Sequence, residues 1–188
     1  MVYWDDLGFE TAYTVDPEPE YPGDGDWRMP ALGVSDEGPG APIAVIRPTD
    51  REPWLLSVRV STVGEIYGAP DPHQICLARR FEPPVVLDVR DPARQVSVDI
   101  DAIHVAAAVD EGLILFADWN SVTAWDGRDI RWRSGQLVEY DLHFRRTGHG
   151  RIVCVGTDYE SVRRFEVTLD AVTGSTLTNR EIVPRGKA

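Results

Sequence analysis

The chain has 188 residues, of which 43% are hydrophobic and 27% charged, a composition typical of a single globular domain. Its formal net charge is −12 at pH 7, which disfavours a nucleic acid as partner. Its apolar runs, such as Leu113–Ala117, are far shorter than the ~20 residues that cross a bilayer, and its acidic start lacks the features of a signal peptide. We therefore expect a soluble, cytoplasmic protein with no membrane contact.

Residues 1–42 form an acidic segment that is rich in proline and glycine. The segment holds ten acidic residues and one basic residue, Arg28, and so carries −9 of the net charge, together with six prolines and six glycines. Proline removes a backbone donor and glycine raises the entropic cost of ordering, so we expect mostly irregular structure with one strand at Phe9–Val15. Large aromatic side chains would hold this arm against an all-β domain formed by residues 43–188.

From Ile43 onward the pattern is that of β-strands separated by turn-forming residues. Six segments before residue 110 are rich in β-branched or alternating residues: Ile43–Ile46, Trp54–Ser61, Gln74–Ala78, Val85–Val89, Val96–Ile100 and Ile103–Val109. One short helical turn is expected at Ser61–Tyr67. We predict an all-β fold in which an antiparallel meander forms a two-sheet sandwich, with a small or partial β-propeller as the alternative.

One pattern of strands and turns occurs twice between Gly112 and Leu177. The first copy comprises Gly112–Asp118, Val122–Gly127 and Ile130–Trp132, and the second comprises Gly150–Gly156, Phe165–Asp170, Ala171–Gly174 and Thr176–Leu177. Gly127 and Gly174 supply the positive φ that tight turns between antiparallel strands require. Trp125 and Trp132 are expected to fill the core beside these turns.

The turns of this repeat resemble those of a known family. Ala124-Trp125-Asp126-Gly127 followed by Trp132, and Leu169-Asp170-Ala171-Val172-Thr173-Gly174, are similar to the blade repeat of quinoprotein-type (PQQ-like) β-propellers, in which a strand ending in Ala-Leu-Asp precedes a Thr-Gly turn and a Trp-bearing strand. The resemblance covers residues 112–177 and implies propeller blades there. None of the family's cofactor-binding residues maps onto this sequence, so no cofactor is expected.

The sequence contains no common catalytic, phosphate-binding or dinucleotide-binding motif. Its four histidines lack the spacing of metal ligands, so no metal site is expected. Cys76 and Cys154 lie in apolar strand-like segments and form no Cys-x-x-Cys pair, which predicts two buried, reduced thiols. The acids and arginines around the repeat are expected to form cross-strand ion pairs.

Five residues remain as candidates for a binding site. Asp99 and Asp101 alternate with apolar residues, so their carboxylates would project from one face of a strand. Asp118, Trp119 and His143 lie at the expected strand ends and turns, where binding sites of β-proteins are commonly built. No catalytic role is assigned to any of them.

Two classes of function fit the sequence. The first is a non-catalytic protein-interaction module, for example an immunity-like protein, that binds a basic partner through its acidic surface. The second is a small-molecule-binding protein or a hydrolase-like enzyme whose site is built from strand ends and loops. Homodimerisation through an unpaired edge strand is compatible with either class. The sequence favours the first, because it carries an acidic arm and many aromatics but no recognisable catalytic constellation.

Overall fold

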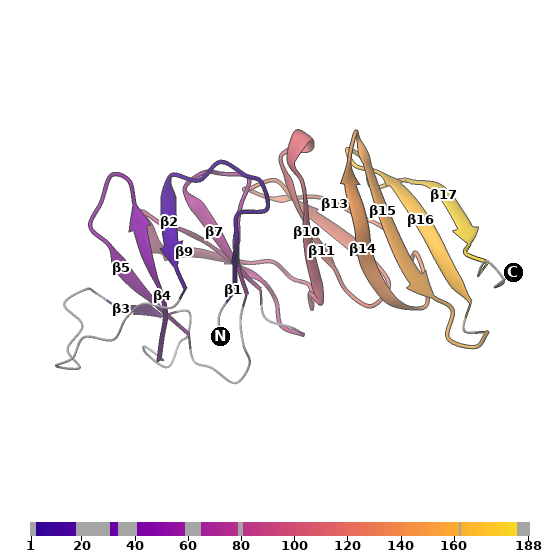
Figure 1. Ribbon diagram of the computed structural model, residues 1–188, viewed down its shortest axis with the longest axis horizontal. Coiled ribbons are helices and arrows are strands. Elements are labelled where there is room, and N and C mark those ends of the chain that lie inside the picture. The colour runs from indigo at the N-terminus through magenta and orange to yellow at the C-terminus, as the bar shows by residue number, and fades with distance from the viewer. Residues whose placement is uncertain are drawn as a thin grey trace, which may run out of the picture. The chain divides into compact units, whose positions relative to one another are not determined.

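The computed structural model describes residues 3–17, 31–33, 41–58, 65–78, 81–161 and 163–183. These residues form β-strands and turns, with one short 3-10 helix at Val109–Glu111 (Figure 1). The prediction of an all-β fold is therefore confirmed. The chain divides into two compact units, Met1–Asp99 and Ile100–Ala188. In the described part of the chain, no helix has the length and apolarity needed to cross a membrane.

The first unit contains two sheets. Its nine strands are β1 (Tyr3–Asp5), β2 (Tyr13–Asp16), β3 (Ala31–Gly33), β4 (Ala41–Pro48), β5 (Trp54–Val58), β6 (Glu65–Gly68), β7 (Gln74–Ala78), β8 (Val85–Asp88) and β9 (Asp91–Ser97). One sheet has the order β1-β6-β7-β8-β9 and the other the order β2-β4-β5-β3. All neighbours are antiparallel except the pairs β1–β6 and β3–β5, which are parallel.

The two sheets of the first unit share one hydrophobic core. Ile46 and Leu56 from one sheet and Ile66 and Ile75 from the other belong to the same buried cluster. Tyr13 is buried, with 2% of its surface exposed. Its hydroxyl group donates a hydrogen bond to the Gln74 carbonyl at 2.7 Å and so links β2 of one sheet to β7 of the other. The unit is thus a two-sheet sandwich, as predicted.

The N-terminal segment contributes to these sheets where the structure describes it. The strand expected at Phe9–Val15 is present only from Tyr13 onward, as β2, and β1 and β3 are not among the expected strands. Gly68 of β6 lies against residue 6, and a Cβ at this glycine would be 2.5 Å from the Asp6 carbonyl oxygen. Residues 18–30 and 34–40 lie outside the described residues, and the predicted domain boundary at residue 42 stays a prediction.

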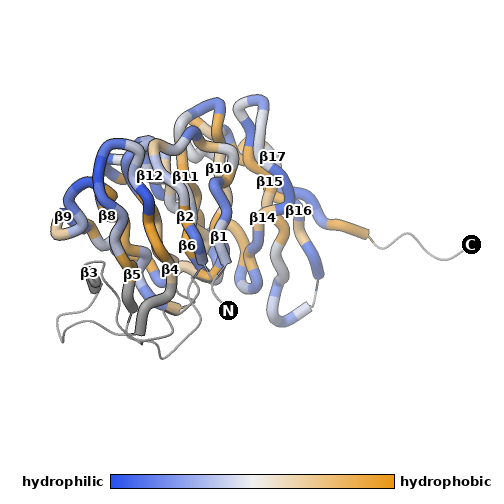
Figure 2. Tube along the Cα trace, turned by 60° about the vertical axis from the view of Figure 1, so that its left-hand side comes forward, coloured by the Kyte–Doolittle hydropathy of each residue, from blue (hydrophilic) through white to orange (hydrophobic). Residues whose placement is uncertain are grey.

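The second unit consists of two four-stranded meanders. One is β10 (His104–Ala108), β11 (Leu113–Ala117), β12 (Val122–Trp125) and β13 (Ile130–Arg133), and the other is β14 (Tyr140–Gly148), β15 (Arg151–Thr157), β16 (Arg164–Asp170) and β17 (Thr176–Glu181). Figure 2 shows hydrophobic residues concentrated within the strands and mostly hydrophilic residues at the turns.

The core of the second unit joins its two sheets. Leu115 and Ala124 of the first meander and Ile152 and Val167 of the second belong to one buried cluster. Trp132 also belongs to it, and the indole Nε1 donates to the Ala171 carbonyl in the turn between β16 and β17 at 2.9 Å. This unit is a second two-sheet sandwich, in which a tryptophan of one sheet is hydrogen-bonded to a turn of the other.

Several local predictions can be compared with the structure. The turns at Gly127 and Gly174 have φ angles of 91° and 70°, and Trp125 and Trp132 are buried, as expected. Cys76 and Cys154 are buried and free, and burial raises the pKa of both thiols, that of Cys154 to about 12.

Two local predictions are wrong. The strand expected at Val96–Ile100 ends at Ser97, because β9 pairs with β8 only up to that residue. The helical turn expected at Ser61–Tyr67 is replaced from Glu65 onward by β6, which pairs with strands on both sides; residues 61–64 lie outside the described residues. Pairing within the sheet outweighs the weak local preference in both segments.

Candidate functional site

Four aspartates cap turns of the second unit. Asp118, Asp126, Asp158 and Asp170 each end or follow a strand, and one carboxylate oxygen of each accepts the backbone N–H groups of the second and third residues beyond it. Hydrogen bonds of this kind stabilise tight turns, since they satisfy donors that lie outside the strand ladder. The aspartates are therefore structural parts of the turns.

Two of these turns are copies of one another. Asp118-Trp-Asn-Ser121 connects β11 to β12, and Asp158-Tyr-Glu-Ser161 connects β15 to β16. In both, the second carboxylate oxygen accepts the serine hydroxyl at 2.6 Å. Each turn carries an aromatic residue directly after its aspartate, namely Trp119 in the first and Tyr159 in the second. The same turn chemistry thus presents one aromatic side chain from each sheet.

These two aromatic residues form a row with Tyr140, the first residue of β14. Trp119 and Tyr140 are stacked with ring centroids 5.0 Å apart and an interplanar angle of 14°. Tyr140 and Tyr159 meet edge to face at 6.0 Å. The three residues are 40%, 42% and 75% exposed, respectively, so the aromatic row (Trp119, Tyr140 and Tyr159) is a surface feature. Its rings hold each other in place without being buried.

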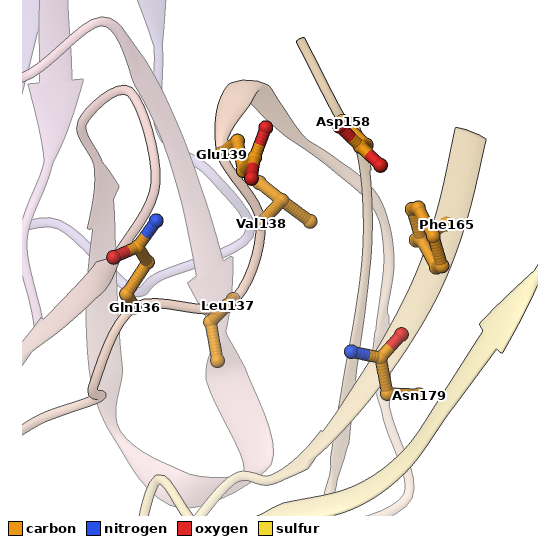
Figure 3. A pocket seen from close by; sticks show the side chains of 7 residues that line it. All are labelled: Gln136, Leu137, Val138, Glu139, Asp158, Phe165 and Asn179. Carbon is orange, nitrogen blue, oxygen red and sulfur yellow. The ribbon is translucent and has the colours of Figure 1, made fainter. Parts of the chain in front are cut away.

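A pocket of about 340 Å³ adjoins the aromatic row. Residues 136–139, which precede β14, line one side, and residues of β16, of β17 and of the turn after β15 line the other (Figure 3). The lining residues are Gln136, Leu137, Val138, Glu139, Asp158, Phe165 and Asn179. Glu139 immediately precedes Tyr140, and Asp158 immediately precedes Tyr159. Row and pocket therefore share the same two backbone segments.

The segment before β14 is fixed by close packing and hydrogen bonds. Leu137 and Val138 are buried, and the Leu137 N–H donates to the Asn120 carbonyl at 2.8 Å. Val138 lies directly over Gly156 of β15, where a Cβ would be 2.5 Å from the valine side chain. Glycine at this position lets the segment approach the sheet. The wall of the pocket is accordingly held by backbone and core contacts.

The two ionisable residues that line the pocket are acids, and one of them is paired with an arginine from outside the lining. Glu139 and Asp158 lie at the same end of it, and none of the lining residues is basic (Figure 3). The Ser161 hydroxyl, the Glu139 carboxyl group and two turn N–H groups hydrogen-bond to Asp158 and lower the pKa of its carboxyl group to about 2. One oxygen of Glu139 accepts the Tyr159 N–H at 2.9 Å. Arg163 forms an ion pair with Asp158 at 3.2 Å.

The structure brings three of the five predicted site residues together in the second unit. Asp118 and Trp119 occupy one turn, and the Trp119 carbonyl accepts the N–H of Leu142, the residue before His143. The His143 ring lies 6.2 Å from that of His104. Asp99 and Asp101 lie beyond the end of β9, so the prediction that both project from one face of a strand is wrong.

The residues that complete the site were not predicted. The five candidates from the sequence do not include Glu139, Tyr140, Asp158 or Tyr159. A signal for two of them exists in the sequence, because Asp-Trp-Asn-Ser at Asp118 recurs as Asp-Tyr-Glu-Ser at Asp158, 40 residues later. Among the described residues, no group of three or more His, Cys, Asp or Glu side chains is placed to hold a metal ion.

Comparisons with known proteins add little to this geometry. No protein-family model matches the sequence, and no curated protein matches it. Among solved structures, hydrazine synthase of Kuenenia stuttgartiensis matches with 16% identity and a TM-score of 0.49, over 83% of this chain and 50% of that chain. The chain thus spans about half the length of that chain, and a likeness this distant carries no argument about function. The resemblance of residues 112–177 to quinoprotein-type blades stays a prediction.

Proposed function

We propose that this chain is a non-catalytic protein-interaction module that holds a basic partner protein, as an immunity-like protein would. The observation that carries the proposal is the exposed aromatic row of Trp119, Tyr140 and Tyr159 beside a pocket lined by two carboxylates. Tyrosine and tryptophan supply a large share of the binding energy in protein interfaces.

The rigidity of the row supports a role in binding. Trp119 and Tyr159 are placed by turns whose aspartates are each hydrogen-bonded to a serine and two backbone N–H groups. Tyr140 is held between their rings by stacking and edge contact. Side chains that are already ordered lose little conformational entropy when a partner binds, so more of the contact energy is available as affinity.

The charge of the molecule supports a basic partner. The net charge is −12, and the pocket beside the row is lined by Glu139 and Asp158 without a basic side chain. Opposite charges accelerate encounter and disfavour acidic competitors. The candidate acid Asp118 does not line this pocket, and both of its carboxylate oxygens accept hydrogen bonds within its own turn.

The proposal is tested by partner capture with the full chain. The wild-type protein is immobilised and exposed to an extract of its native host, in parallel with a triple variant, W119A/Y140A/Y159A, and a control, V172A/L177A. The control removes two exposed apolar side chains of the same unit that lie outside the row. We expect one basic protein to be retained by wild type and control and to be lost from the triple variant. A partner whose purified form binds all three proteins equally would refute the proposal.

The carboxylate pair of the pocket favours a second candidate, a hydrolase-like enzyme or small-molecule binder. Two carboxyl groups in one pocket can divide acid and base roles between them. Incubation with chromogenic glycosides and esters tests this directly. Turnover that the variant E139Q abolishes, while E160Q retains it, would support an enzyme; equal, residual turnover in both would exclude Glu139 from such a role.

A further inference from the structure

We draw no further inference here: the strongest candidate, the outer edge of β17, which among the described strands pairs only with β16, carries no proposal because nothing in the structure shows what covers it.

Discussion

At the scale of single residues, the acidic side chains of the second unit have two different roles. Asp118, Asp126 and Asp170 accept hydrogen bonds from backbone N–H groups and so stabilise turns. Glu166 is buried and forms ion pairs with Arg145 of β14 and Arg180 of β17. None of these four carboxyl groups lines the pocket. Glu139 and Asp158 differ because they combine structural hydrogen bonds with a position at a pocket.

Asp158 should make stability depend on pH in the acid range. The pKa of its carboxyl group is about 2 in the folded protein and about 4 in an unfolded chain. A lowered pKa stabilises the folded state above the unfolded value, and this contribution disappears as the pH falls from about 4 to about 2. We expect Asp158→Asn to lower the urea midpoint at pH 5 and to have a progressively smaller effect toward pH 2. The variant D110N, at an exposed acid of the 3-10 turn, serves as control; a constant effect of D158N across this range would contradict the argument.

At the scale of elements, the candidate site is a product of the repeated turn. The two Asp-aromatic-x-Ser turns are equivalent in chemistry and in place, since each connects the second strand of its meander to the third. Tyr140 comes from a different element, the start of β14. The row therefore needs both sheets of the sandwich, and neither sheet alone forms it.

The turn between β16 and β17 should be sensitive to the smallest substitution. Gly174 has a φ of 70°, and a Cβ there would overlap the indole ring of Trp132. We expect Gly174→Ala to lower the free energy of unfolding by about 1–2 kcal/mol for the backbone and by a further 1–3 kcal/mol for the overlap. Gly112→Ala is the matched control, because its φ is 64° but no atom lies within 4 Å of the added Cβ. Chemical denaturation measures the free energy of unfolding of the two variants. Equal decreases would mean that the Trp132 side chain moves away from the added Cβ at no cost in stability.

The sequence predicts strands better than it predicts the site, for a physical reason. β7 has the predicted bounds of Gln74–Ala78, because a buried strand with turn residues on both sides is specified by its own composition. The row is not specified in this way. Trp119, Tyr140 and Tyr159 are separated by about 20 residues each, and only the packing of two sheets brings their rings together. Local composition does not encode that distance.

At the scale of the whole molecule, most of the net negative charge lies in the first unit, whereas the candidate site lies in the second. Residues 1–99 hold 18 acidic and 8 basic residues, a net charge of −10, whereas residues 100–188 hold 13 and 11, a net charge of −2. The aromatic row and the pocket lie in the second unit. Under the proposed function, long-range attraction of the basic partner would therefore come mainly from the first unit, and short-range contact from the second.

This division predicts separate effects on association and dissociation rates. Deleting residues 1–42 is unsuitable as a test, because it would remove β1 and β2 from their sheets and Tyr13 from the core. Neutralising Glu18, Glu20, Asp24 and Asp26 to the corresponding amides removes four charges from the first unit instead. We expect this variant to bind the partner with an association rate several-fold lower at about 50 mM salt and nearly equal to wild type at about 500 mM, since charges act at long range only where salt does not screen them. Tyr159→Ala should instead raise the dissociation rate at both salt concentrations, because it removes a contact made after docking. Surface plasmon resonance with the captured partner measures both rates, and a dissociation rate raised by the amide substitutions alone would place the contact surface in the acidic segment rather than at the aromatic row.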